Sequence, residues 1–507
     1  MPDKVIVTNW SAIQGKYNAC ARTIRDAVDE LVVADAARGI QDRIIDLSDS
    51  ASMAAVGATA VTNATHCKEN KDAIDAVFRH YAPDYLLLLG SVDVIPHQNL
   101  ENSIRDSDLV IWSDLPYACD AGYSKLVKDF AAPTRVVGRL PDLTKKSDAA
   151  GFVTTIRTAA RWQIRDRADY EIPFALTAED WKESTNTNLK AVFGNGQTAL
   201  ESPPDGPKWP AADLARRSHF VNCHGEADTP HFMGEGTSGR CRAHSAALLP
   251  GKITEGTVLA AECCYGAQLY DPQIRSGQEG ICNTYLLHGA YGVMGSSTES
   301  YGSVKSNLSA DLICQYFFKS VLKGASLGRA LLEARQEFLK TTQPFGPVAE
   351  KTLAQFNLLG DPSIHPVQSA PVPPAGPPPP PGVWAPPTAE VKGRREELRA
   401  TGLNILNTLA RAYPTKAAWI LDEFPELADI VQSMELGNTS LYEFRIDGPP
   451  HDPHANLSLN VLLGFAPPPR RRGVGGTGLL PAEPASVVIE ALVDGKKIVT
   501  HEVYVSR

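Results

Sequence analysis

Short apolar runs alternate with longer amphipathic segments over the first third of the chain, and this alternation restricts the fold more than any other sequence feature. The apolar runs cover residues 4–8, 43–47, 85–90 and 134–140, and helical patterns lie near residues 18–37, 71–81 and 147–168. Such an order predicts βαβ units and a parallel sheet. Because the runs are apolar throughout, we expect helices on both sides of the sheet. The polar turn at residues 90–93 follows a strand, where open α/β sheets bind ligands.

The same alternation continues through the middle of the chain. The predicted strands cover residues 174–178, 219–223, 257–263 and 291–296, and the predicted helices lie near residues 279–288, 303–322 and 326–341. Two successive α/β sheets, or one extended sheet, therefore account for residues 1 to about 367. We divide this part into an N-terminal α/β subdomain, residues 1–168, and a second α/β subdomain, residues 169–367.

A proline-rich segment marks the clearest domain boundary. Residues 369–388 contain ten prolines, a composition that favours an extended polyproline II spacer over a packed core. We place the linker at residues 368–390 and a small C-terminal α+β module at residues 391–507. Within this module, the pattern at 390–436 is helical, and residues 441–507 read as strands separated by a loop rich in proline, arginine and glycine.

The charge balance argues against a nucleic-acid partner. The chain has 49 Lys and Arg against 58 Asp and Glu, a net charge of −9, so it lacks a general attraction to nucleic acid or to an anionic membrane. No run approaches the roughly 18 apolar residues of a membrane helix, and the first residues lack the pattern of a signal peptide. We therefore expect a cytoplasmic protein without a membrane partner, with its nine cysteines present as reduced thiols.

Two predicted strands of the middle region end in reactive side chains near a glycine. His224 and Gly225 follow one apolar run, and Cys263 and Cys264 close the next, just before Gly266. Neighbouring parallel strands end at one edge of a sheet, so a histidine and a cysteine there can face a common crevice. A thiol with an imidazole partner forms a nucleophilic pair. Glycine in such turns lets backbone N–H groups come close to a developing oxyanion.

These segments resemble the caspase-like cysteine peptidases and, among them, the gingipain-type family. The motifs that carry the resemblance are FVNCHG (220–225), AECCYGA (261–267), YGVMGSSTESYG (291–302) and LLGDPSIHP (358–366), with PDYLLLLGSVDVIP (83–96), SDLPYACD (113–120) and VVGRLPD (136–142) in the first half. The resemblance covers roughly residues 1–367. It implies caspase-like parallel-sheet halves covered by helices.

The resemblance also implies roles for the residues at the two strand ends. His224 would be the catalytic imidazole, and the amides of Gly225 and of the nucleophile would form the oxyanion hole. The caspase-like pattern of an acid, a small residue, Cys, any residue and Gly selects Cys264, whereas relatives with Cys-x-x-Gly would select Cys263. Consecutive side chains of a strand point to opposite faces, so only one of the two cysteines can meet His224. The first pattern favours Cys264.

The family resemblance further admits a basic substrate residue at P1, the position before the cleaved bond. A buried ammonium or guanidinium needs an acidic partner. The candidate substrate-binding acids are Asp120, Asp129 and Glu299, each of which is otherwise a solvated loop carboxylate. The resemblance also places an aromatic residue beside this pocket, and Tyr301 occupies that position.

A competing interpretation of the same region is a structural zinc site. His231, Cys241 and His244 are suitable ligands, and the last two have the two-residue gap of a zinc half-site. The interpretation that we carry forward is a cysteine endopeptidase that hydrolyses protein or peptide substrates and needs no metal or other cofactor. The alternative is a catalytically silent scaffold of the same fold that binds a protein partner through its C-terminal module.

Overall fold

The computed structural model describes residues 2–303, 306–342 and 345–368, together with five C-terminal stretches, 405–409, 440–447, 458–466, 485–494 and 497–507. The predicted linker, apart from residue 368, lies outside the described residues. The same holds for the predicted helical segment at 390–436, except for residues 405–409.

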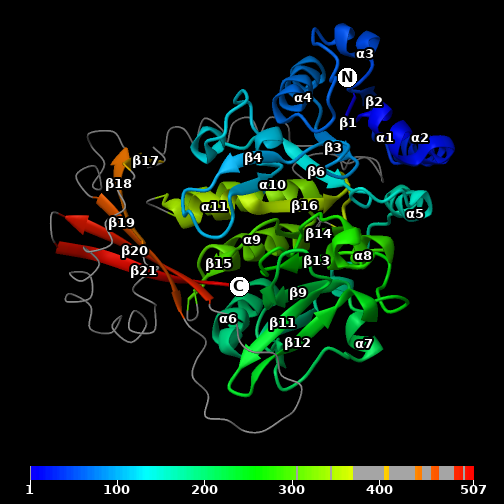
Figure 1. The fold of residues 1–507 in the computed structure, drawn as a ribbon. Coiled ribbons are helices and arrows are strands. Elements are labelled where there is room, and N and C mark those ends of the chain that lie inside the picture. The colour runs from blue at the N-terminus through cyan, green and yellow to red at the C-terminus, as the bar shows by residue number, and fades with distance from the viewer. Residues whose placement is uncertain are drawn as a thin grey trace, which may run out of the picture.

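One extended sheet, rather than two, forms the framework of residues 4–360 (Figure 1). Its ten strands, in spatial order, are β2 (Asp42–Asp46), β1 (Lys4–Thr8), β3 (Tyr85–Leu89), β6 (Val136–Leu140), β16 (Phe356–Gly360), β14 (Gly292–Ser296), β13 (Val258–Ala261), β9 (Ser218–Asn222), β7 (Phe174–Ala178) and β8 (Leu200–Ser202). Strand β16 joins the two halves, because it runs parallel to β6 and antiparallel to β14.

The two halves of the sheet therefore run in opposite directions. Within each half the neighbouring strands are parallel. As a result, the carboxyl ends of β9 and β13 lie at one edge, and the turn at residues 90–93 lies at the other. The turn at residues 90–93 and the predicted crevice beside His224 and the cysteines therefore lie at opposite edges of the sheet.

Helices cover both faces of the sheet, as the apolar strands predict. The α-helices of the described residues are α1 (Trp10–Tyr17), α2 (Ala21–Ala37), α3 (Ser50–Ala55), α4 (Cys67–Tyr81), α5 (Ala149–Ala160), α6 (Lys182–Phe193), α7 (Ala211–Leu214), α8 (Ile281–Leu287), α9 (Ala310–Leu322), α10 (Leu327–Thr341) and α11 (Pro347–Gln355). Alternate residues of β13 enter two separate cores. Val258 and Ala260 pack with α9 and α10, whereas Leu259 and Ala261 pack with α8. The predicted α/β class is thus confirmed. None of the described helices is long and apolar enough to cross a membrane.

Two small antiparallel sheets accompany the large one. The first contains β10 (His224–Gly225), β11 (His231–Gly236) and β12 (Gly239–Ser245), so His224 begins a short strand immediately after β9. The second pairs β4 (Gln98–Glu101) with β5 (Val110–Ser113).

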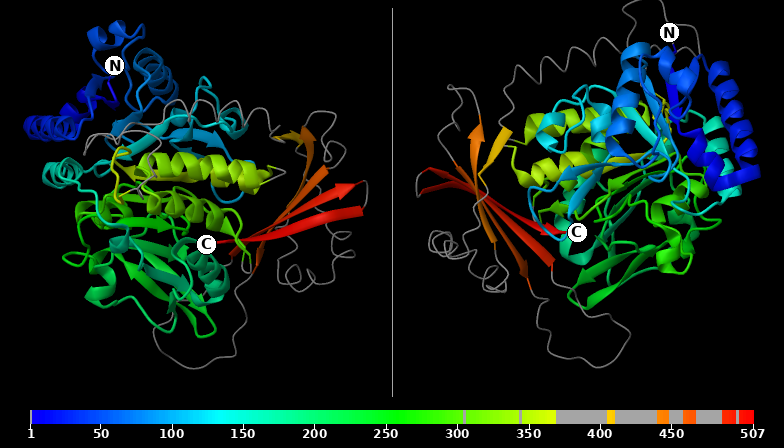
Figure 2. Two further views of the ribbon diagram at one scale, coloured as in Figure 1. Left: turned by 180° about the vertical axis from the view of Figure 1, so that it is seen from behind. Right: turned by 45° about the horizontal axis from the view of Figure 1, so that its top comes forward.

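The described C-terminal stretches form one further antiparallel sheet that is continuous with the rest of the molecule (Figures 1 and 2). Its order is β15 (Tyr301–Gly302), β21 (Lys497–Ser506), β20 (Ala485–Asp494), β19 (Ser458–Ala466), β18 (Ser440–Asp447) and β17 (Ile405–Leu409). Strand β15 belongs to the second subdomain, so the C-terminal sheet adds to it edge to edge. The helical prediction is wrong at residues 405–409, which pair with β18 as a strand.

Candidate active site

The two consecutive cysteines that follow strand β13 point to opposite sides of the chain. Cys263 is fully buried in the core that contains Leu259 and Ala261, and burial raises its pKa well above the ordinary value. Cys264 leaves this core, and its Sγ accepts a hydrogen bond of 3.1 Å from the backbone N–H of Ser300. Only Cys264 therefore faces the segment that follows β14.

The residue after Cys264 holds an unusual backbone conformation. Tyr265 has a φ of 55°, which is uncommon for a bulky residue and is found where the surroundings fix the chain. Its N–H donates to the Thr298 carbonyl at 3.0 Å, and its hydroxyl donates to the Asp108 carboxylate at 2.9 Å. The turn that carries Cys264 is thus fixed from both its backbone and its side chain.

His224 lies on β10, between a carboxylate and an indole ring. Its Nε2 is 2.8 Å from the Glu235 carboxylate on β11, and its ring packs edge-on against Trp181 with centroids 4.3 Å apart. Burial lowers the pKa of His224, although Glu235 opposes the shift. Sequence reasoning missed Glu235, which stands between two glycines in GEG, residues 234–236.

Gly225 brings the histidine turn against the cysteine turn. A Cβ at Gly225 would lie 1.6 Å from the carbonyl oxygen of Cys264, so no other residue fits without moving the backbone. The structure thereby places the two strand ends in contact, as expected for neighbouring parallel strands.

The backbone of Arg507 occupies the space in front of Cys264. The N–H of Cys264 donates to the Arg507 backbone oxygen at 2.9 Å, and the N–H of Arg507 donates to the Ser300 carbonyl at 3.0 Å. Cys264 is consequently 3% exposed. Burial raises the pKa of its thiol to about 12, and the nearby Glu299 charge adds to the shift.

The side chain of Arg507 fills a closed acidic pocket. Its Nη2 donates to both carboxylate oxygens of Asp311 at 2.9 Å each and to the Ser303 carbonyl at 2.8 Å. Its Nη1 lies 3.6 Å from the Glu262 carboxylate, and the guanidinium stands 5.0 Å from the Trp181 ring centroid. Arg507 is 1% exposed.

The pKa values of the two carboxyl groups in this pocket depend on the presence of Arg507. Burial raises the pKa of Asp311 to about 6, against the opposing charge of Arg507. Burial and the charge of Asp311 hold the pKa of Glu262 well above its ordinary value, again against Arg507. Gly302 forms the near wall, since a Cβ there would meet Arg507 Nε at 2.1 Å. Sequence reasoning named neither Asp311 nor Glu262 as substrate-binding acids.

The substrate-binding residues predicted from sequence lie in different places. Asp120 pairs with Arg135 at 3.1 Å, and Asp129 accepts a hydrogen bond of 2.5 Å from Ser124 near the surface. Glu299 and Tyr301 flank Ser300 and lie beside Cys264, with Tyr301 in β15 as the direct partner of Ser506. The structure thus brings Glu299 and Tyr301 to the site, and it gives Asp120 and Asp129 other partners.

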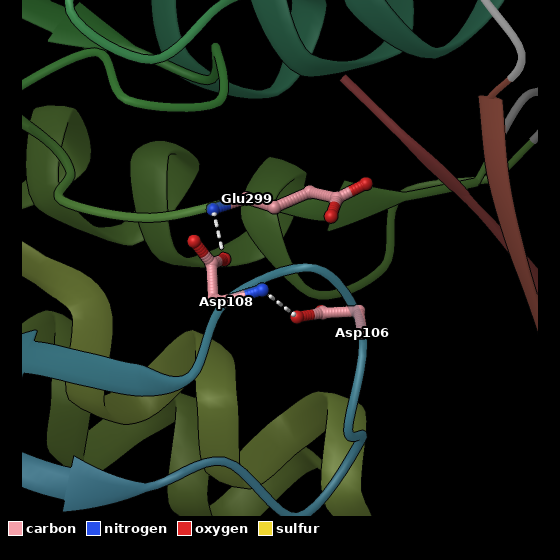
Figure 3. Close-up of side chains that lie close together, drawn as sticks. All are labelled: Asp106, Asp108 and Glu299. Carbon is pink, nitrogen blue, oxygen red and sulfur yellow. Dashed lines mark hydrogen bonds between the residues drawn. The ribbon is translucent and has the colours of Figure 1, made fainter.

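An acidic cluster, defined here as Asp106, Asp108 and Glu299, lies next to the turn that carries Cys264, because the Tyr265 hydroxyl donates to Asp108. Figure 3 shows its three side chains. The Asp108 carboxylate accepts a hydrogen bond of 2.8 Å from the Glu299 N–H. Lys351 Nζ bridges the cluster, at 2.6 Å from Asp106 and 2.7 Å from Asp108. Burial alone would lower the pKa of Lys351, but these carboxylates raise it. The ammonium therefore occupies the position that a cation would take.

The residues of the zinc hypothesis do not converge. Among the described residues, three or more potential metal ligands meet only in the acidic cluster. Cys241 Sγ contacts the Ser202 hydroxyl at 3.3 Å, and His244 Nε2 lies 2.8 Å from the Tyr285 hydroxyl. A zinc site at His231, Cys241 and His244 is therefore not supported.

Comparison with known proteins confirms the resemblance. Residues 251–367 match the model of peptidase family C25, the gingipain family, and this segment contains both cysteines but not His224. The match supports a cysteine-peptidase role. No curated protein sequence matches the chain.

The chain also has similarity of low sequence identity to solved structures. A structure described as a protease is 12% identical, with 99% of this chain and 97% of that chain covered and a TM-score of 0.49. The Saccharomyces cerevisiae separase in complex with securin is 13% identical, with 46% of this chain covered and a TM-score of 0.30. This chain spans only 14% of the length of that separase chain.

Proposed function

We propose that this protein is a cysteine endopeptidase in which Cys264 is the nucleophile and His224 is the acid and base. The observation that carries the proposal is the Cys264 N–H, which already donates at 2.9 Å to the backbone oxygen of Arg507. An N–H in that position stabilises the oxyanion of acyl transfer. Gly225, packed on the Cys264 carbonyl, would supply the second amide.

The proposed reaction needs only groups of this chain, the substrate and water. His224, neutral because burial lowers its pKa, takes the thiol proton as Cys264 Sγ attacks the carbonyl carbon of the P1 residue. The tetrahedral oxyanion collapses, the peptide C–N bond breaks, and His224 gives its proton to the leaving amine. Water then attacks the thioester and loses a proton to His224, which returns it to the departing thiolate.

Glu235 is the residue that we assign to positioning His224. Its carboxylate lies 2.8 Å from Nε2, so it fixes the rotation of the ring and stabilises the imidazolium formed during the reaction. The Trp181 ring, packed against the imidazole, limits the same motion from the other side.

We also propose that the enzyme prefers a basic P1 residue, and that Asp311 and Glu262 select it. Both carboxyls are fully buried, and a buried carboxylate favours a paired cation over a neutral side chain. In this proposal Asp311 and Glu262 select the P1 residue in place of the three acids expected from the sequence, Asp120, Asp129 and Glu299. Tyr301 and Gly302 would bind the substrate backbone as a neighbouring strand.

The expected setting of this enzyme is the cytoplasm, with protein or peptide substrates. All nine cysteines are free, which is typical of a reducing compartment. Cell fractionation with an antibody against the chain would test this assignment.

A peptide library incubated with the Arg507→Ala protein, and with the same protein carrying a second substitution at Cys264 or Cys263, tests the proposed function, because Arg507 closes the site in the wild type. We expect cleavage after Arg or Lys, loss of cleavage in Cys264→Ala, and retained cleavage in Cys263→Ala, because Cys263 belongs to the core. Cleavage that persists in Cys264→Ala would refute the assignment of the nucleophile. No cleavage by any form, with Cys264 accessible, would favour the silent scaffold.

A further inference from the structure

We infer that residues 503–507 of this chain bind in their own active site as a substrate-like strand, with Arg507 as the P1 residue, and keep the enzyme inactive until they leave. The inference rests on the proposed function for the identity of the nucleophile. It deepens that proposal, because it names the ligand of the closed state and the event that opens the site.

The backbone contacts are those of a bound peptide rather than of ordinary packing. Ser506 and Val505 pair in antiparallel register with Tyr301 and Gly302. Arg507 continues the ladder through its N–H to Ser300, and its backbone oxygen receives the Cys264 N–H. Strand addition of this type is a general mode of peptide recognition, in which main-chain bonds give affinity and pockets select alternate side chains.

The side chain of Arg507 explains how two buried carboxyls are tolerated in one pocket. Asp311 and Glu262 are each 0% exposed, and two neighbouring carboxylates without a cation are strongly disfavoured. The guanidinium lies on Asp311, near Glu262 and over Trp181. The same ring contacts His224, so the occupied pocket and the catalytic imidazole share one wall.

The rest of the C-terminal sheet holds this strand in place. Strand β21 pairs with β20 over most of its length, and Glu490 of β20 accepts a hydrogen bond of 3.0 Å from the Val348 N–H. Tyr504 and Leu459 pack with Tyr301 in one core. A tethered ligand competes at an effective concentration of about millimolar, so free substrates at lower concentration are excluded from the site.

Alkylation of Cys264 by iodoacetamide, located by peptide mass spectrometry, measures the occupancy of the site. In the wild-type protein we expect Cys264 to react at least tenfold more slowly than Cys20, which is exposed in the same molecule. Arg507→Ala should raise the rate at Cys264 at least tenfold, because the strand then lacks its pocket contacts. Thr500→Ala, at an exposed position of the same strand, is the matched control and should leave the rate unchanged.

A synthetic peptide of residues 503–507 gives the second measurement. Added to Arg507→Ala, it should slow the alkylation of Cys264 again, whereas the same peptide with alanine in place of its arginine should not. Protection by the first peptide alone would show that the pocket binds arginine from a separate peptide as well as from the chain itself.

The results that would overturn the inference are distinct from those that would overturn the peptidase. Equal alkylation of Cys264 and Cys20 in the wild-type protein refutes the occupied site, whatever the peptides do. Equal rates at Cys264 in wild type and Arg507→Ala refute the role of Arg507. Faster alkylation in Arg507→Ala without any peptide cleavage would retain the bound strand and refute the proposed activity instead.

Discussion

Replacement of Asp311 by asparagine should remove most of the preference for arginine at P1. The substitution keeps the size of the side chain but removes the charge that meets Arg507 Nη2 through two contacts of 2.9 Å. Removing one partner of a buried ion pair costs about 3–5 kcal/mol. Because Glu262 remains 3.6 Å from Nη1, we take the lower end, about 3 kcal/mol, which corresponds to roughly a 100-fold change.

The assay compares two fluorogenic peptides that differ only in the P1 residue, one with arginine and one with citrulline, its uncharged isostere. The ratio of their kcat/KM values cancels differences in folding, in nucleophile reactivity and in occupancy by the chain's own strand. We expect the ratio to be large in the wild type and to fall about 100-fold in Asp311→Asn. Asp129→Asn is the matched control and should leave the ratio unchanged.

The same ratio should depend on pH with a definite sign. Burial raises the pKa of Asp311 to about 6 while Arg507 is bound, and the pKa is higher in an empty pocket because Arg507 lowers it. Only the ionised carboxylate attracts the guanidinium, and kcat/KM reports the free enzyme, so the preference for arginine should rise as the pH increases above about 6. This rise should be absent from Asp311→Asn. A ratio that Asp311→Asn leaves intact, or that Asp129→Asn reduces, would refute the assignment of the pocket.

Three further predictions follow from single contacts. Gly302→Ala should abolish cleavage after arginine, because the new Cβ would lie 2.1 Å from the position of the guanidinium Nε, while Cys264 should still react with iodoacetamide. Gly122→Ala, with open space around it, should leave cleavage unchanged. Glu235→Gln should lower kcat about 10- to 100-fold. It should also shift the acidic limb of the pH profile to lower pH, because Glu235 raises the pKa of His224 against the effect of burial. An unchanged profile would contradict the positioning role of Glu235. Chelators should leave activity unchanged, because Lys351 bridges the acidic cluster; activity lost with EDTA and restored by a divalent cation would contradict this.

The sequence predicts eight of the ten strands of the large sheet, because most of them are short apolar runs between polar turns, and it does not predict β8 or β16. The runs at 4–8, 85–90 and 174–178 correspond to β1, β3 and β7 within one residue. The order of strands across the join could not be predicted. Strand β16 has the same apolar composition as its neighbours, and nothing local indicates that it pairs antiparallel with β14 and parallel with β6.

The candidate site likewise has one part that the sequence predicts and another part that it does not. The His-Gly and Cys motifs are local, so the sequence could name His224, Gly225 and the cysteine pair, and strand alternation could separate Cys263 from Cys264. The pocket depends on contacts between residues far apart in the chain. Asp311 lies in the first turn of α9 and Arg507 follows β21. Only the packing of the C-terminal sheet against β15 brings them together.

The glycine at position 302 illustrates why the pocket is hidden from pattern analysis. Its sequence neighbourhood, TESYGS, reads as an ordinary turn, and the requirement for glycine appears only when the Arg507 side chain is placed against it. Glu299 and Tyr301 were accessible to sequence reasoning because they belong to the same short motif.

The most direct test of the central claim is to locate the residue that an arginine-directed affinity label modifies. A peptide ending in an arginine chloromethyl ketone, incubated with Arg507→Ala so that the site is open and mapped by tandem mass spectrometry, should form a thioether with Cys264. The label should leave Cys263 unmodified and should not react at the same concentration with the same protein carrying Asp311→Asn. A label on Cys263, or equal labelling by a reagent with glutamate in place of arginine, would contradict the account of this site.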